Sequence, residues 1–381
     1  MTFSGLDDMG NVATIVQLFL GAAGVTALTA GLRVGPMRAM TLAYKSRFFG
    51  GPLFRVSVRK SEIDRLRTDL DSLVDLASYV VVKGDKGIGK SCMIDTALHG
   101  MKGVVRTKIS PDTSEVDVLK QCYRKITGGP GFTFFDEEAN VKRVLFWYKS
   151  FHGSSPTVVM AMSERTAGSG YAQVTGAVRT LAELGVRVIV DASPNSAPPD
   201  LTTTKRQIEI NISVMTSDQM RSIPELRALF RRLDPMGLSE VVLELIGGNP
   251  ADFHQLARVL AKSDCTDIPG AVEAFLVERV VEADRRLKAM LPGNQKFKKI
   301  FELLGKQKPV ATSELSERDL QLPTPCKVLR MRTLDDGNDV VVPSSPLVSL
   351  LLQHSSDVPK TKLAVHKMIH EAASASAARA K

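Results

Sequence analysis

Apolar residues in the first half of the chain follow two alternating patterns. Short runs rich in β-branched residues occur in "YVVV", "GVVRTKI", "TVVMAM" and "VRVIV", and such runs are typical of buried parallel strands. Between these runs, apolar residues recur at helical spacing, as in "RKSEIDRLRTDLDSLVDLAS" before the first run. Strands that alternate with helices predict an α/β domain, in which helices cover both faces of a parallel sheet.

The pattern changes twice in the second half. From Ser217 the strand signal stops, and the sequence as far as Lys262 predicts several short helices. After Asn294 a helix is followed by "CKVLRMRTLDDGNDVVVPSS", in which Asp336-Gly337 separates two strand-like runs and predicts a hairpin turn. Helices followed by such a hairpin indicate a winged helix, and the closing "SASAARAK" has the composition of a disordered tail.

These changes divide the chain into predicted segments. They are an N-terminal segment over 1–35, a basic linker over 36–60, the α/β domain over 61–215, a helical subdomain over 216–292, a winged-helix-like domain over 293–358 and a partly disordered tail over 359–381. The net charge of +9 favours an anionic partner such as a nucleotide, a nucleic acid or an acidic membrane surface. The four cysteines are far apart, which argues against a disulfide framework or a zinc site.

The N-terminal segment contains a stretch without charged residues, Met9 to Leu32, that is long enough to span a bilayer as a helix. Asp7 and Asp8 precede it, and basic residues alone follow it: Arg33, Arg38, Lys45, Arg47, Arg55, Arg59 and Lys60. We expect a single-pass membrane anchor with the remainder on the cytosolic or mitochondrial matrix side. The alternatives for this stretch are a buried helical hairpin, a targeting region or a signal peptide. The alternative for the whole protein is a soluble intracellular location.

A glycine-rich loop follows the run "YVVV". Its residues Gly84 to Ser91, "GDKGIGKS", satisfy the G-x-x-x-x-G-K-[ST] pattern between a predicted strand and a predicted helix. Glycines let backbone amides approach a polyanion, Lys90 would bridge the β- and γ-phosphates, and the Ser91 hydroxyl would ligate magnesium. The pattern therefore predicts ATP with Mg²⁺, bound by Gly84, Asp85, Lys86, Gly87, Ile88, Gly89, Lys90, Ser91 and Cys92.

An acid that holds the magnesium shell is expected at the end of a later strand. Two positions compete. "TVVMAMSER" occupies the right place in the order of elements and offers Glu164, although Ser163 stands where an aspartate would be familiar. "FTFFDEE" offers Asp136 and Glu137, which are better explained as favourable charge at a helix start. We favour Glu164 as catalytic acid and metal ligand. The serine at position 163, in place of an aspartate, predicts slow hydrolysis.

Two further polar positions are candidate catalytic residues. The strand "VRVIVDASPN" ends with Asp191, Ser193 and Asn195 at the sheet edge where ligands of α/β proteins bind, so Asn195 is expected to sense the γ-phosphate. A simple turn is the alternative. Arg206 is expected to act as an arginine finger toward a neighbouring subunit, and a surface arginine is its alternative.

Taken together, the helix around Glu62, the "GDKGIGKS" loop, the "VRVIVDASPN" strand and "GGNPADFHQLA" at Gly247 to Ala257 resemble AAA+ or STAND-type ATPases, especially archaeal-type and origin-recognition-like members. The resemblance covers about Arg59 to Gln353. It implies a P-loop sheet, a helical lid opened by the G-G-x-P motif, and a C-terminal winged helix. His254 or Arg258 would then sense nucleotide from the lid.

The expected function is an ATPase that couples nucleotide state to movement of an unidentified protein client at a membrane, with a homo-oligomer left open. One alternative is a nucleotide-gated switch or scaffold with little hydrolysis. Another is nucleic-acid binding by the winged helix, which Lys327, Arg330 and Arg332 support and Asp335, Asp336 and Asp339 oppose.

Overall fold

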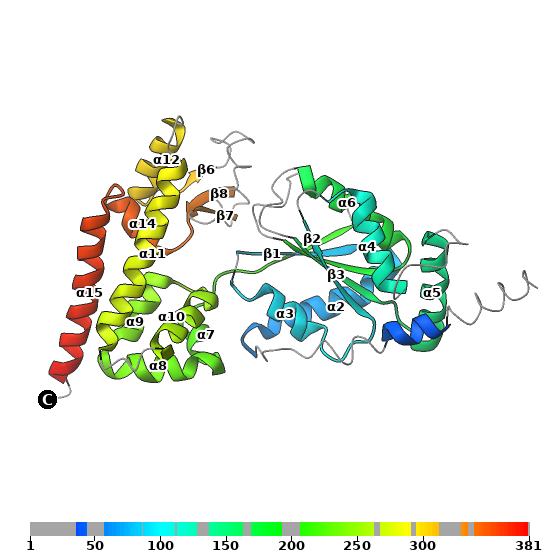
Figure 1. Cartoon of the computed structure of the whole chain (residues 1–381), viewed down its shortest axis with the longest axis horizontal. Helices are drawn as coiled ribbons and strands as arrows, with labels where there is room; N and C mark the ends of the chain where they lie inside the picture. The colour runs from blue at the N-terminus through cyan, green and yellow to red at the C-terminus, as the bar shows by residue number, and fades with distance from the viewer. Residues whose placement is uncertain are drawn as a thin grey trace, which may run out of the picture.

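The structure is a computed structural model. It describes residues 36–43, 57–85, 87–110, 113–127, 137–162, 169–192, 206–262, 267–290, 295–311, 329–333 and 339–379. An α/β part contains the larger sheet, and a mainly helical part contains the C-terminal helix and a smaller sheet (Figure 1).

The larger sheet confirms the predicted parallel α/β architecture. Its strands are β1 (Tyr79–Lys83), β2 (Val104–Ile109), β3 (Thr157–Met162), β4 (Arg187–Ala192) and β5 (Gln207–Asn211), in the spatial order β2-β3-β4-β1-β5. Every pairing is parallel. The β-branched run of β1 is fully buried, because helices cover both faces of the sheet.

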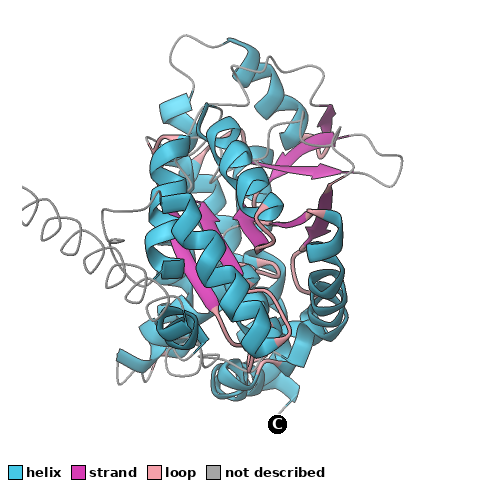
Figure 2. Ribbon diagram, turned by 90° about the vertical axis from the view of Figure 1, so that its right-hand side faces the viewer, coloured by secondary structure: helices cyan, strands magenta, loops and turns pink. Residues whose placement is uncertain are grey.

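Two helical layers produce that burial (Figure 2). Helices α2 (Lys60–Leu76) and α3 (Lys90–Ala97) pack on one face. Helices α4 (Glu115–Thr127), α5 (Glu137–His152) and α6 (Ser169–Glu183) pack on the other. A helix over residues 36–43 adds Ala39, Leu42 and Ala43 to the second layer, so the chain before α2 is attached to the α/β part.

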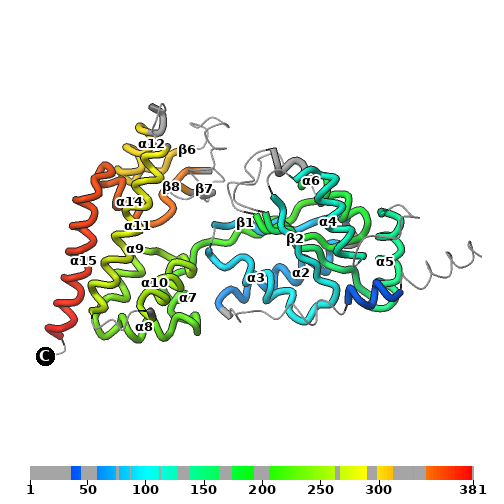
Figure 3. The backbone as a smooth tube through the Cα atoms, viewed as in Figure 1, coloured from blue at the N-terminus to red at the C-terminus, as the bar shows by residue number. Residues whose placement is uncertain are grey.

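The helical part begins directly after β5, where the chain passes from the sheet into α7 (Figure 3). It contains α7 (Ser217–Ser222), α8 (Arg227–Leu233), α9 (Leu238–Ile246), α10 (Pro250–Lys262), α11 (Ile268–Met290), α12 (Gln295–Gly305), α14 (Pro346–Gln353) and α15 (Val358–Arg379). All of these helices contribute to one hydrophobic core.

Helix α15 corrects the prediction of a partly disordered tail. The helix continues to Arg379, and Thr361, Val365 and Ile369 are buried along one side of it. These buried residues recur at helical spacing, and the alanine-rich end that resembled a disordered segment also has high helix propensity.

The predicted hairpin is confirmed in its strands. β7 (Leu329–Thr333) pairs antiparallel with β8 (Asp339–Pro343), and Thr333 lies opposite Asp339. The short strand β6 (Val310–Ala311) pairs with the other side of β8. The winged helix itself stays a prediction, because residues 312–328 lie outside the described part of the chain.

None of the helices that the structure describes is both long enough and apolar enough to cross a membrane. The predicted anchor, Met9 to Leu32, lies outside the described residues.

Candidate functional site

The glycine-rich loop connects β1 to α3 and has a backbone that requires glycine. Gly87 and Gly89 have φ angles of 86° and 97°, a left-handed conformation that side chains disfavour. A Cβ on Gly84 would lie 2.5 Å from the Ile88 side chain and 2.8 Å from the carbonyl oxygen of Ile212. The motif glycines therefore shape a tight loop in front of the α3 N-terminus.

Lys90 is folded back over this loop. Its ammonium group donates hydrogen bonds to the carbonyl oxygens of Gly84 and Asp85, at 2.6 and 2.9 Å. The carboxylate of Asp191 lies 3.9 Å from the same nitrogen. A phosphate that reached the loop would meet a positive charge that is already in place.

Asp191 lies beside the serine of the motif. Strand β4 is the direct neighbour of β1, and their register aligns Asp191 with Val82 at the carboxyl end of the sheet. The Ser91 hydroxyl donates a hydrogen bond of 2.9 Å to Asp191 Oδ2. Strand order and register thus bring together a hydroxyl and a carboxylate, the hard oxygen ligands that Mg²⁺ prefers.

Burial and charge act in opposite directions on this carboxyl group. Burial raises the pKa of Asp191 above its ordinary value, while Lys90, the hydrogen bond from Ser91 and Arg106 oppose the rise. Arg106, on β2, also forms an ion pair with Asp95 of α3. The pKa of Arg106 is lowered by burial, against the influence of Asp191.

The raised pKa predicts how stability depends on pH. Folding favours the protonated form of Asp191. The stabilisation that this gives the folded state is fully present below the ordinary pKa of an aspartate, and it is lost as the pH rises through the raised pKa of Asp191. Without nucleotide, Asp191→Asn should therefore be more stable than the wild type at neutral pH, and the gain should shrink toward about pH 4. Urea unfolding of both proteins across this range checks the expectation, and a gain that grows toward low pH would contradict it.

The helical part touches the loop through its G-G-x-P motif. A Cβ on Gly87 would lie 2.6 Å from Asn249 Oδ1 and 2.7 Å from Cβ of Ala251, so the start of α10 lies directly against the loop. A Cβ on Gly248 would lie 1.8 Å from the carbonyl oxygen of Met215, whose amide in turn donates to the Gly248 carbonyl at 3.0 Å. The loop and the start of α10 are therefore in direct contact.

The two candidate lid sensors lie on α10. His254 is half-buried and Arg258 is exposed. The pKa of His254 is lowered by burial and, less strongly, by Arg258, while Glu225 opposes the shift. Glu225 also adds to the rise that burial causes in the pKa of Cys92 on α3. The carboxylate of Glu225 therefore acts on both the loop helix and the lid helix.

Arg59 belongs to the site, a role that its position in the sequence does not predict. Its guanidinium group is buried and donates to the carbonyl oxygens of Ile88, at 3.2 Å, and Ser213, at 2.6 Å. Glu62 accepts a further hydrogen bond of 3.2 Å. Arg59 thereby joins the loop to the segment that leads into α7.

The other predicted residues fall into two groups. Lys86, Asp136, Ser163, Glu164 and Asn195 lie outside the described residues, so their roles stay predictions. Glu137 is the first residue of α5, as expected for a charge at a helix start. Arg206 precedes β5, at the end of the strands opposite the loop, and pairs with Glu183 at 3.1 Å, so its role toward a neighbouring subunit stays a prediction.

No protein-family model matches the sequence, and no curated protein matches it. Among solved structures, a chain of Drosophila ORC bound to DNA is 12% identical with a TM-score of 0.40, over 83% of this chain and 91% of that one. Thermotoga maritima RuvB, a Holliday junction branch migration motor, is 12% identical with a TM-score of 0.37, over 74% and 91%. C. elegans PCH-2 is 10% identical with a TM-score of 0.36, over 61% and 71%. Such distant likeness carries no functional argument, and the assignment rests on the geometry of this chain: an α/β fold with a P-loop.

Proposed function

We propose that this chain is an ATP-binding P-loop ATPase of the AAA+/STAND type. The observation that carries the proposal is the meeting of Lys90, Ser91 and Asp191 at the end of β1, in front of the glycine loop. A chance glycine-rich turn would explain the loop, but it would not explain a largely buried carboxylate hydrogen-bonded to the motif serine.

Each group has a definite task in this proposal. The loop amides and Lys90 bind the phosphates. To do so, Lys90 gives up its hydrogen bonds to the carbonyl oxygens of Gly84 and Asp85 and donates to phosphate oxygens instead. Ser91 and Asp191 hold Mg²⁺, which neutralises phosphate charge when bound. Asp191 also orients water at the phosphate end of the site, and Arg106 stabilises the ionised form of its carboxylate.

Nucleotide binding would be transmitted through two contacts. Asn249 and Ala251 of the lid lie against Gly87, and Arg59 connects the loop to Ser213. Movement of the loop would therefore shift the helical part, which we propose acts on a protein client. We further propose that Arg206, which is exposed at the end of the sheet opposite the loop, acts toward a neighbouring subunit in a homo-oligomer.

A nucleotide-gated switch with little hydrolysis is the second candidate. It is favoured by Ser163, which stands where a familiar aspartate would follow β3, and by the buried, proton-favouring environment of Asp191. Both features weaken the electrostatic support for hydrolysis without preventing phosphate binding.

Membrane attachment and nucleic-acid binding remain proposals with different support. The uncharged stretch from Met9 to Leu32 precedes the helix over 36–43, which packs on the α/β part and would hold the ATPase close to a bilayer. Nucleic-acid binding is supported in the sequence by the positive charge of Arg330 and Arg332 and opposed by the negative charge of Asp339.

Steady-state phosphate release by the full-length chain tests the proposal. An ATPase should release phosphate in a Mg²⁺-dependent reaction, and the Lys90→Ala variant should show no such reaction. Parallel assays with anionic vesicles and with duplex DNA show which partner changes the rate. Saturable ATP binding without turnover would select the switch, and the absence of both binding and turnover would refute the proposal.

A further inference from the structure

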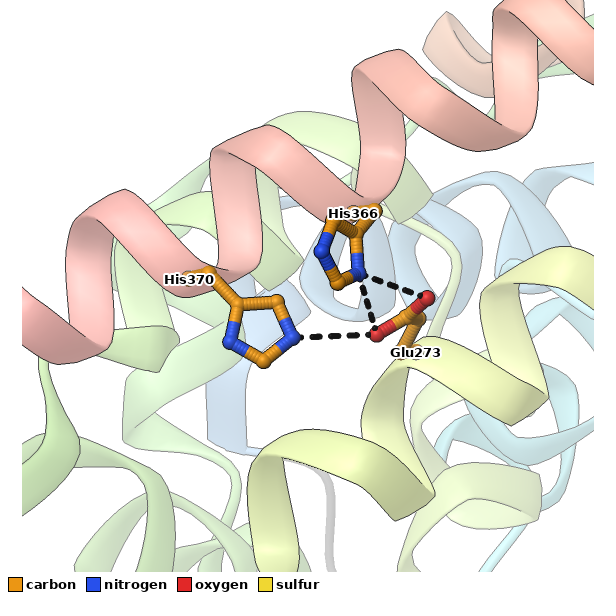
Figure 4. Close-up of side chains that lie close together, drawn as sticks. All are labelled: Glu273, His366 and His370. Carbon is orange, nitrogen blue, oxygen red and sulfur yellow. Dashed lines mark hydrogen bonds and ion pairs between the residues drawn. The ribbon is translucent and has the colours of Figure 1, made fainter.

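A cluster of potential metal ligands lies far from the nucleotide loop in sequence, between α11 and α15. His366 Nδ1 lies 3.0 Å from both carboxylate oxygens of Glu273, and His370 Nε2 lies 3.2 Å from Glu273 Oε2 (Figure 4). One donor atom from each residue lies within 4.8 Å of the others. The nucleotide site uses none of these three residues.

The fold fixes the spacing of the cluster. His366 and His370 are four residues apart on α15, which places both imidazoles on one face of the helix (Figure 4). Val365 and Ile369, one residue before each histidine, are buried in the core shared with α11. The cluster is therefore held by packing on both sides and does not depend on a loop.

Two of the three separations between donor atoms suit one ion, and the third, between the histidine nitrogens, is within 4.8 Å. Bonds of about 2.0–2.2 Å to nitrogen and oxygen ligands in tetrahedral arrangement place donor atoms roughly 3.3 Å apart. The two histidine–carboxylate separations, 3.0 and 3.2 Å, are close to that value. Both histidine side chains are about half exposed, at 50% and 49%, so water has access to complete the coordination shell.

We propose that Glu273, His366 and His370 bind a divalent transition-metal ion of the Zn²⁺ class. Two imidazoles and one carboxylate suit zinc and its neighbours, whereas Mg²⁺ and Ca²⁺ prefer oxygen ligands alone. Binding would replace the ring protons that now face the carboxylate, and it would join the C-terminal helix to α11. The competing explanation is a pair of ordinary histidine–glutamate ion pairs.

Zinc titration of the chelator-treated full-length chain, without nucleotide and against a chromophoric competitor, tests the site. One Zn²⁺ per chain should bind, and His366→Ala, His370→Ala and Glu273→Gln should each weaken binding at least about tenfold. These residues are on the helix surface, so the variants should keep the wild-type circular dichroism spectrum. His99→Ala is the matched control, because His99 is an exposed histidine outside the cluster and should leave binding unchanged.

Thermal unfolding gives an independent readout. Zn²⁺ should raise the melting temperature of the wild type and of His99→Ala, and a chelator should reverse the shift. The shift should be absent from His370→Ala and from Glu273→Gln. No zinc bound by the wild type, or equal binding by the wild type and all three cluster variants, would overturn the proposal in favour of simple ion pairs.

Discussion

Replacing Lys90 by alanine is expected to remove Mg²⁺-dependent ATP binding and to leave the protein folded. The ammonium group is the cation that the loop holds in front of its own glycines, where it donates hydrogen bonds to carbonyl oxygens of Gly84 and Asp85. Hydrogen bonds to charged groups contribute about 1.5–3 kcal/mol each, so the affinity should fall by about 10²-fold or more. Calorimetric titration with ATP and Mg²⁺ measures the loss.

Lys102→Ala is the matched control for this experiment. Lys102 is an exposed lysine just before β2, at the end of the sheet opposite the loop, so its removal changes the net charge equally without touching the site. Its ATP affinity should equal that of the wild type. A folded Lys90→Ala protein with wild-type affinity would show that the loop does not bind phosphate.

Replacing Asp191 by asparagine is expected to have the largest effect on hydrolysis. Asparagine keeps the shape and an acceptor oxygen for the Ser91 hydroxyl, but it removes the negative charge beside Lys90 and Ser91. If that charge supports the transition state, the rate of phosphate release should fall by about 10²-fold or more. ATP binding should persist, because Lys90 and the loop amides remain.

Glu164→Gln, measured in parallel, separates the two candidate acids. The sequence favours Glu164 by the order of elements, whereas the structure places the Asp191 carboxylate on Ser91. Asp64→Asn is the control, since Asp64 is exposed on α2. Loss of turnover in Glu164→Gln with an unchanged rate in Asp191→Asn would mean that Asp191 only positions the serine.

The sequence predicted four of the five strands of the larger sheet because those four contain runs rich in β-branched residues. It missed β5, whose residues Gln207 and Glu209 are polar. β5 is an edge strand, and its polar side stays partly exposed there: Lys83 forms an ion pair of 2.6 Å with Glu209. Its alternation of polar residues with Ile208 and Ile210, which pack on the core, is a strand pattern that a criterion of continuous apolar runs passes over.

The site was predictable only where it is local in sequence. The loop from Gly84 to Ser91 follows from its own residues, and the structure gives it the expected backbone. The contact between Ser91 and Asp191 depends on β4 lying beside β1, and no spacing in the sequence specifies that order. Arg59 bonds to Ser213 across 154 positions, which is equally hidden from local patterns.

Equilibrium titration of the full-length chain with ATP, with and without Mg²⁺, tests the central claim most directly. If Lys90, Ser91 and Asp191 form a magnesium–nucleotide site, one ATP should bind per chain, and Mg²⁺ should tighten binding in the wild type. In Ser91→Ala, Mg²⁺ should have little effect on affinity. No saturable ATP binding, or the same Mg²⁺ effect in Ser91→Ala and the wild type, would contradict the account.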